Sequence, residues 1–207
     1  MSSQRPRPKS SSTPKVEHPA VETLKTLGLS VIFAFGLRTA VAESCYIPSA
    51  SMQPTLQIND KLIVDKISYR FSNPVRGDIV VFSPTEQLAR HIDTEGNQKF
   101  KENFIKRVIG VPGDRVEIKG GKVYINGKVI AEKYLDEAPN YDWSSKALTP
   151  DGIVPEDRYL VLGDNRNNSY DSHYWGFVPK DKIVGKAVVR FWPLDRAGAI
   201  DSHSEKQ

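Results

Sequence analysis

The stretch that decides the fold is Val116–Ile130, which reads VEIKGGKVYINGKVI. It contains three short runs of alternating apolar and polar residues, separated by Gly120-Gly121 and Asn126-Gly127. Alternation with a period of two is typical of strands that bury one face. An Asn-Gly pair between two such runs indicates a hairpin, because a type I′ turn needs positive φ at both central positions. The stretch therefore predicts consecutive antiparallel hairpins.

Further short strands are predicted on both sides of these hairpins, bounded by turn residues such as Arg76-Gly77. No long amphipathic helix is predicted beyond residue 42. The fold class expected is therefore mainly β, with an antiparallel β-sheet domain over residues 43–193. Residues 131–157 are polar and Pro-rich and are expected to form an irregular excursion, and residues 194–207 are expected to fray. The additional strands expected are Lys61–Val64, Asp78–Phe82, Phe104–Ile109, Tyr159–Leu162 and Ile183–Phe191.

Two segments precede this domain. Residues 1–19 are rich in Ser, Pro and basic side chains, which predicts a disordered tail. Residues 20–42 carry an apolar run that is short for a transmembrane helix of about 20 residues, but Lys25 and Arg38 near its ends can snorkel to the headgroups. We expect one N-terminal transmembrane helix. A cleaved signal peptide is the alternative.

The charge of the tail predicts the orientation of this anchor. Its basic residues have no acidic partner among the first fifteen residues, and basic segments stay on the cytoplasmic side of a membrane. The N-terminus is therefore expected in the cytoplasm and the β domain on the exported side. The basic residues are Arg5, Arg7, Lys9 and Lys15.

Composition limits the classes of function. The 207 residues have room for one ordinary domain plus tails. The net charge is only +4, so there is no basic footprint for nucleic acid. The single Cys45 excludes an intrachain disulfide and a cysteine-built metal site. We expect no cofactor and no metal.

A hydroxyl-rich turn between two prolines, PSASMQPT at Pro48–Thr55, follows the apolar segment closely. Its position predicts a nucleophile held at a membrane surface. The chain has only four histidines, and none of them lies in a context typical of a Ser-His-Asp triad. Lysine is the remaining general base for a serine.

A lysine base must be buried, because its reference pKa of ~10.4 keeps an exposed amine protonated at neutral pH. Burial can lower that pKa to ~7–8. Lys106, inside the apolar strand Phe104–Ile109, is the best candidate. The alternative is that Lys106 and Arg107 straddle an edge strand with one side chain in solvent. The residues alone leave both interpretations open.

A third block, GDNRNNSYDSHYWGFVP at Gly163–Pro179, is densely polar but flanked by apolar residues. We expect it to fold against the core.

These blocks resemble the type I (leader) signal peptidases of the S26 family, membrane-anchored serine proteases that remove signal peptides from exported preproteins. The resemblance extends over about residues 20–193 and lies in four blocks in the family's order. The blocks are Pro48–Leu56, Arg76–Phe82, Phe104–Val116 and Gly163–Pro179.

The resemblance implies a role for five residues. Ser51 takes the place of the nucleophile and Lys106 that of the general base. Ser49 matches the serine whose hydroxyl, with the Ser51 backbone N–H, forms the oxyanion hole. Ser169 matches the serine that orients the lysine, and Asp171 belongs to the same supporting block.

The resemblance also implies the substrate and the location. Preprotein signal peptides would be cut after small residues of the Ala-X-Ala type. The substrate would lie as an extra strand beside Cys45–Ser49, with Ile47, Phe104 and Ile105 as apolar walls. The partners would be these peptides and membrane lipid, in the plasma membrane or another energy-transducing membrane such as the thylakoid.

Two positions depart from the family pattern, which often has Asp at the position of Asn167 and Arg at that of His173. We expect His173 to weaken its pair with Asp171 or to make it pH-dependent. Two other functions remain as alternatives. One is a self-cleaving repressor-type Ser-Lys protease, and the other is a membrane-tethered β domain that binds extended peptides without cleaving them.

Overall fold

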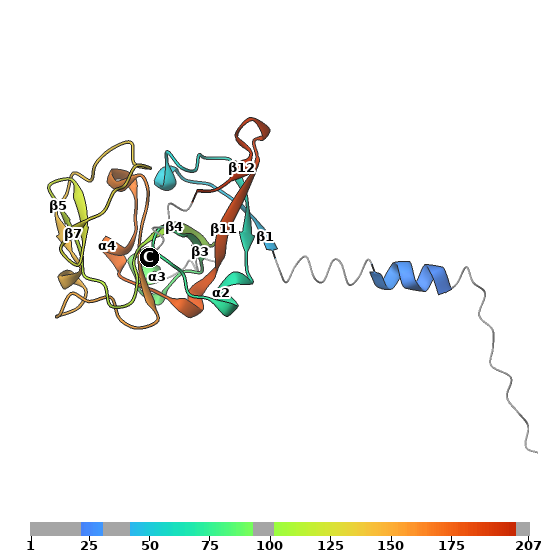
Figure 1. Cartoon of the computed structure of the whole chain (residues 1–207), viewed down its shortest axis with the longest axis horizontal. Helices are drawn as coiled ribbons and strands as arrows, with labels where there is room; N and C mark the ends of the chain where they lie inside the picture. The colour runs from blue at the N-terminus through green and yellow to red at the C-terminus, as the bar shows by residue number, and fades with distance from the viewer. Residues whose placement is uncertain (1–21, 31–41, 93–101, 202–207) are drawn as a thin grey trace, which may run out of the picture. The chain divides into compact units, whose positions relative to one another are not determined.

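The computed structural model describes residues 22–30, 42–92 and 102–201 (Figure 1). Residues 22–30 are helical, and residues 42–201 belong to one compact unit. The predicted tail at 1–19 and most of the predicted span at 20–42 lie outside the described residues. Within the described ranges, no helix has both the length and the apolar character that a membrane crossing requires.

An antiparallel sheet of eight strands forms the body of the domain, in the order β1-β2-β11-β3-β4-β9-β10, with β12 paired to β11. Strand β1 lies at one edge, whereas β4 lies in the interior between β3 and β9. The strands are β1 (Ala42–Tyr46), β2 (Lys61–Asp65), β3 (Ile79–Phe82), β4 (Phe104–Gly110), β9 (Arg158–Leu162), β10 (Val178–Pro179), β11 (Ile183–Trp192) and β12 (Gly198–Ala199).

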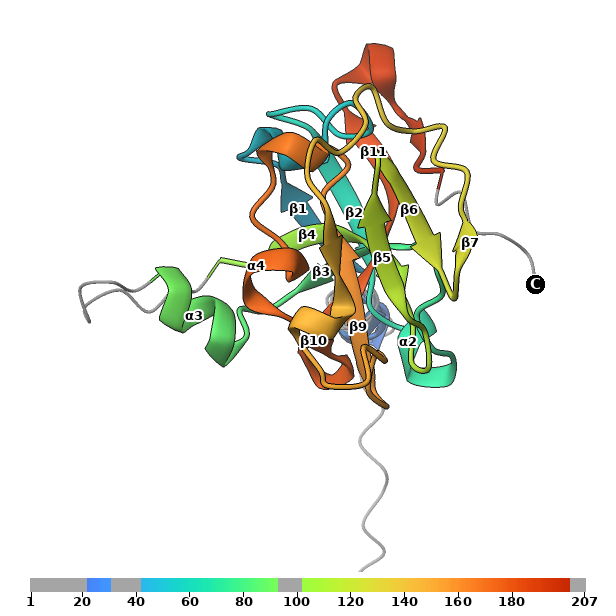
Figure 2. The same cartoon turned by 90° about the vertical axis from the view of Figure 1, so that its left-hand side faces the viewer.

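The predicted hairpins form a second, smaller sheet of four strands in the order β7-β6-β5-β8. Figure 2 shows β5, β6 and β7 side by side. Asn126 and Gly127 have φ of 52° and 81°, as the predicted type I′ turn requires. The strands are β5 (Val116–Lys119), β6 (Lys122–Ile125), β7 (Lys128–Val129) and β8 (Trp143–Ser144).

Helices in the domain are short and serve as connections. The α-helices are α2 (Ser68–Phe71), α3 (Glu86–Ile92) and α4 (Ser172–Trp175). The 3₁₀ turns are η1 (Ala50–Met52), η2 (Ser145–Ala147), η3 (Arg166–Asn168), η4 (Lys180–Lys182) and η5 (Leu194–Arg196).

Three apolar clusters bury the interior of the domain. One cluster lies around β1, β2 and the turn after β1, the second between the small sheet and β9, and the third around β3, α3 and α4. Strand β4 contributes to all three through Ile105, Ile109 and Val108. Its side chains are therefore covered by protein on both faces, which is the setting that a buried lysine needs.

The mainly antiparallel β fold predicted from the sequence is confirmed, but the ends of the domain differ from expectation. Residues 42–46, predicted as the end of the anchor and the start of the domain, form the edge strand β1. Residues 194–201, which we expected to fray, hold η5 and β12 instead. Arg196 fixes this segment because its guanidinium pairs with the fully buried Asp60, and Ile200 packs on the core.

Candidate active site

The side chains of Ser51 and Lys106 meet inside the domain. Ser51 lies in η1, the turn that follows β1, and Lys106 lies on β4. The amine of Lys106 is 2.8 Å from Ser51 Oγ, and it donates a second hydrogen bond to the Ile105 carbonyl at 2.9 Å. Both residues are buried, at 9% and 4% exposure. A serine hydroxyl and a lysine amine are therefore in direct contact away from bulk water.

Burial lowers the pKa of Lys106 from 10.5 to about 8, because desolvation disfavours the ammonium form. Asp171 and Asp164 act in the opposite direction through their negative charges. The net result is an amine that is partly neutral near physiological pH. The interpretation of Lys106 as a surface lysine on an edge strand is wrong, because β4 is an interior strand.

The neighbouring cation, Arg107, is stabilised in its charged form. Its guanidinium makes two hydrogen bonds to the buried Asp164 carboxylate, at 2.8 and 2.7 Å, and a third to the Gly77 carbonyl at 2.8 Å. Its other face lies 3.9 Å from the centre of the Tyr134 ring. Lys106, in contrast, forms no salt bridge among the described residues and contacts only a hydroxyl and a carbonyl.

Ser49 lies beside Ser51 at the exposed end of the turn. The two hydroxyl oxygens are 3.3 Å apart, and Ser49 is exposed while Ser51 is buried. Ser49 has extended backbone, with φ of −129° and ψ of 159°. Its hydroxyl can therefore face the same atom of a substrate as the Ser51 hydroxyl.

Ser169 lies against the other side of the turn. It is 9% exposed, and its hydroxyl makes no hydrogen bond within the described residues. A Cβ atom on Gly163 would lie 2.2 Å from Ser169 Oγ and 2.4 Å from the Ser51 carbonyl oxygen. Glycine at 163 thus allows the block that follows β9 to pack directly on the turn that carries Ser51. The predicted hydrogen bond from Ser169 to Lys106 is not present in this structure.

Asp171 supports this block from within. It is completely buried, and its carboxylate accepts a hydrogen bond from the Gly163 backbone at 2.9 Å. Its second oxygen lies 2.7 Å from His173 Nδ1. The His173 ring lies between the rings of Tyr141 and Tyr174. Asp171 and His173 are therefore in contact, and the weakening or pH dependence of this pair stays a prediction.

Asn167, the second departure from the family pattern, contacts the irregular excursion. Its side-chain oxygen accepts a hydrogen bond from the Asn140 backbone at 2.9 Å, and its amide donates to the Ala138 carbonyl at 3.1 Å. Nearby, Arg166 pairs with Glu132, which is also in the excursion. The excursion is therefore fastened to the block that packs on Ser51.

Two of the residues expected as apolar walls for the substrate are almost fully buried, at 1% exposure for Ile47 and 7% for Ile105, and their role as walls stays a prediction. Ile47 and Ile105 are buried in the first core cluster, and Phe104 stacks on Phe82 with ring centres 6.0 Å apart. A cavity of about 300 Å³ does run beside β1, but its apolar lining includes Pro48 and three valines. The valines are Val64, Val81 and Val184.

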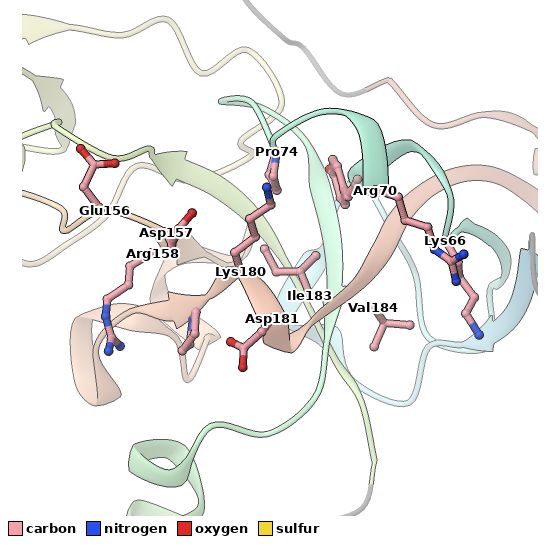
Figure 3. A pocket seen from close by; sticks show the side chains of 12 residues that line it. Lys66, Arg70, Pro74, Glu156, Asp157, Arg158, Lys180, Asp181, Ile183 and Val184 are labelled. Carbon is pink, nitrogen blue, oxygen red and sulfur yellow. The ribbon is translucent and has the colours of Figure 1, made fainter.

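A larger cavity, of about 780 Å³, opens beside α2, β10 and the start of β11 (Figure 3). Its lining mixes cations such as Arg70 and Lys180 with anions such as Glu156 and Asp181. None of the residues predicted for the site lines it. Size alone therefore does not locate the chemistry in this domain.

Sequence reasoning did not single out two residues that connect the parts of the site. Asp164 holds Arg107 and accepts a hydrogen bond from Thr55 in the turn after Ser51. Asn165 donates its backbone N–H to the Ser51 carbonyl at 3.1 Å and its amide to the Ala50 carbonyl at 3.2 Å. Both residues belong to the polar block after Gly163, and this membership is the sequence feature that could have pointed to their role.

A serine hydroxyl lies against a buried lysine amine whose pKa is lowered, and such a pair can supply a nucleophile and a general base. Comparison with known proteins then identifies the family. The family model described as signal peptidase, peptidase S26, matches residues 20–192. The chain belongs to this family. The repressor-type protease considered above is not the family that matches.

Individual relatives agree with this assignment. Signal peptidase I of Leptolyngbya laminosa is 53% identical over 94% of this chain and 91% of its own length. The probable thylakoidal processing peptidase 2, chloroplastic, of Arabidopsis thaliana is 38% identical over 89% of this chain and 47% of its own length. A crystal structure of a signal peptidase I from Enterococcus faecalis V583 is 33% identical, covers 56% of this chain and 97% of that one, and has a TM-score of 0.44.

Proposed function

We propose that the protein is a type I signal peptidase, a serine endopeptidase that removes N-terminal signal peptides from exported preproteins. In this proposal Ser51 is the nucleophile and Lys106 the general base. The observation that carries the proposal is the 2.8 Å contact between the Lys106 amine and Ser51 Oγ in a buried setting.

The low pKa of Lys106 makes the first proton transfer feasible. With a pKa of about 8, about a tenth of the lysine is neutral at pH 7. The neutral amine accepts the Ser51 proton while Oγ bonds to the carbonyl carbon of the scissile peptide. The lysine then gives that proton to the leaving amine, and the signal peptide remains as an ester on Ser51.

Hydrolysis of the ester repeats these steps with water. Lys106 takes a proton from the attacking water and returns it to Ser51 Oγ when the ester bond breaks. We assign the developing negative charge on the carbonyl oxygen to the Ser49 hydroxyl and the Ser51 backbone N–H, because the Ser49 and Ser51 hydroxyls are 3.3 Å apart. The unpartnered, buried hydroxyl of Ser169 is assigned to orient the lysine when its amine is neutral.

The substrate is proposed to add a strand beside β1, which is an edge strand. The cavity beside β1 has a volume of only about 300 Å³ and Pro48 in its lining, which suits the small side chains of an Ala-X-Ala site. Beside Ile47, Phe104 and Ile105, we propose the valines that line the cavity as further parts of its apolar wall.

The location proposed is a membrane, plasma or thylakoid, with one span at residues 20–42 and the β domain on the exported side. The apolar run and the basic tail support this topology. The similarity to a chloroplastic thylakoidal processing peptidase supports a thylakoid as one of the two locations.

The test is cleavage of a purified preprotein that carries an Ala-X-Ala site, with the cut mapped by mass spectrometry. We expect one cut after the second alanine and no cut by Ser51→Ala. Phe in place of that alanine should abolish cleavage. A wild-type protein that leaves the preprotein intact would refute the proposed function, and the noncleaving peptide-binding domain would then be the better interpretation.

A further inference from the structure

The cavity beside β1 has a direction relative to Ser51. Its lining follows β1 from Glu43 to Pro48, and Ser51 lies three residues beyond Pro48. A substrate whose cut bond lies at Ser51 must therefore place its preceding residues along this cavity. The substrate then runs parallel to β1, with its earlier residues toward Glu43.

The spacing of extended chains gives the register. Two neighbouring strands both advance by about 3.3 Å per residue, so positions pair one to one along the groove. If the residue before the cut lies near Pro48 or Ser49, then the residue beside Glu43 is the sixth or seventh before the cut. Allowing one residue for twist, the far end of the cavity receives positions five to seven.

The cavity carries two acidic side chains, whereas the three valines in its lining are apolar. Glu43 from β1 and Glu102 from the segment before β4 line the cavity, and both are exposed. Glu102 precedes Lys106 by four residues, so like Glu43 it is remote from Ser51 along its own segment. Lys66 lies 3.3 Å from Glu43 and offsets part of its charge. Glu102 has no salt bridge among the described residues. The lining contains no cation of its own.

From this arrangement we propose that Glu43 and Glu102 select the charge of the signal peptide at positions five to seven before the cut. A basic residue there is favoured and an acidic residue is disfavoured. The selection rests on the proposed function, because it acts on the same substrate in the same groove. It is independent of the small-residue preference at the cut, since the two lie at opposite ends of the cavity.

The exposure of Glu43 and Glu102 to solvent determines how large their effect on kcat/KM should be. Pairs of exposed charges contribute modestly in water and are screened by salt. Exchanging Lys for Glu at one substrate position changes an attraction into a repulsion, so we expect about a 3- to 10-fold difference in kcat/KM. The difference should appear mainly in KM, because these groups are remote from the reacting atoms.

The experiment measures kcat/KM of the full-length enzyme for preproteins that differ only in one residue. Lys, Gln or Glu is placed in turn at the fifth, sixth and seventh position before the cut. We expect the order Lys, Gln, Glu at one or more of these positions, and a smaller spread at high salt. Equal kcat/KM for all three residues at all three positions would overturn the proposal.

Variants of the enzyme test which of the two carboxylates, Glu43 or Glu102, selects the charge of the substrate. Glu102→Gln should reduce the spread, and Glu102→Lys should reverse it, so that the Glu preprotein becomes the better substrate. Glu156→Gln is the matched control, since Glu156 is an exposed glutamate in the other cavity and its loss changes the net charge equally. The control should keep the wild-type spread. A spread unchanged in Glu102→Gln and Glu43→Gln would also refute the assignment.

The two levels of failure are distinguishable. If the wild-type enzyme cuts no preprotein in the series, the proposed function itself fails. If it cuts all of them with equal kcat/KM, only the charge selection fails. The melting temperature of each variant checks its folding, and the wild-type series decides the proposal even if a variant does not fold.

Discussion

Lys106 and Arg107 are adjacent cations on β4, and both are buried, but their surroundings differ in kind. Asp164 neutralises Arg107, while Lys106 contacts only a hydroxyl and a carbonyl. Burying a charge is costly unless it is paired. The guanidinium therefore stays charged as a structural group, and the amine can lose its proton. Two neighbouring positions of β4 therefore differ in role: Arg107 forms a structural pair with Asp164, whereas Lys106 is the proposed general base.

The pKa of Lys106 predicts the pH dependence of cleavage. Only the neutral amine acts as a base, so kcat/KM should rise as pH increases through about 8 and then level off. Lys106→Arg should be inactive at every pH, because a guanidinium keeps its proton in proteins. Initial rates from pH 6 to 9.5 on one preprotein check both statements. A rate independent of pH across this range would contradict the role of Lys106.

Stability should respond oppositely to removal of the two cations. Lowering the pKa of Lys106 from 10.5 to about 8 costs the folded state about 3 kcal/mol below pH 8. Between pH 8 and 10.5 the unfolded chain binds more protons, so the free energy of unfolding rises with pH in that window. Lys106→Met should therefore stabilise the protein at pH 7, by about 1–3 kcal/mol.

Arg107→Met is the contrasting variant at the next position. It leaves the Asp164 carboxylate buried without its partner and should destabilise the protein by about 3–5 kcal/mol. Urea unfolding of both variants at pH 7 measures the two effects. A loss of stability in Lys106→Met as large as that in Arg107→Met would show that the fold stabilises the Lys106 ammonium, which contradicts a lowered pKa.

For Ser169, we predict that removal of the hydroxyl lowers activity without lowering stability. Its buried hydroxyl has no partner among the described residues, and an unsatisfied buried polar group costs about 1–3 kcal/mol. Ser169→Ala should keep or raise the melting temperature. If the hydroxyl orients the neutral Lys106, kcat should fall by up to about 10²–10⁴-fold with a smaller change in KM. Unchanged kcat would remove the orienting role.

At the scale of elements, the site depends on how closely the block after β9 packs on η1. Gly163 allows that approach, since a Cβ there would overlap Ser169 Oγ and the Ser51 carbonyl. Gly163→Ala should therefore lower kcat by at least about tenfold and reduce stability, because the neighbouring backbone must shift. Gly198→Ala is the control, since no atom lies within 4 Å of the added Cβ. Assays of kcat and melting temperature for both variants compare them.

The sequence predicted those strands and turns that local residue patterns determine. The hairpins at Val116–Ile130 follow from alternation and from an Asn-Gly turn with positive φ. The short strands β1, β8, β10 and β12 were not predicted, because their two to five residues lack an apolar run and take strand geometry from the strand that they pair with. The same limit explains why the burial of Lys106 could not be read from β4 alone.

For the candidate site too, the sequence predicted features that are local and missed those that depend on long-range contacts. The residue types and their blocks were visible in the sequence, and the structure brings Ser49, Ser51 and Lys106 together. The walls of the substrate groove stay a prediction, since which face of a curled sheet opens to solvent depends on tertiary packing. The roles of Asp164 and Asn165 are long-range contacts with the turn at 50–55, and no local pattern encodes them.

At the scale of the whole molecule, the proposed topology can be tested with the single native cysteine removed. Cys45→Ala supplies the background, and one new cysteine is placed at Lys128, which is exposed in the β domain, or at Ser3 in the tail. A membrane-impermeant maleimide added to intact, wall-stripped cells should label only the cysteine at 128. Labelling of the cysteine at position 3 alone would reverse the orientation.

The place of β11 in the sheet has a consequence for how the enzyme is made. Every residue assigned to the chemistry precedes Ser172, but β2 and β3 are joined only through β11, which ends at Trp192. A ribosome must therefore deliver nearly the whole chain before Ser51 and Lys106 are held in register. Until β11 has been made, the sheet that holds Ser51 and Lys106 is incomplete, so we expect the nascent chain to have no hydrolytic activity while it is still being translated.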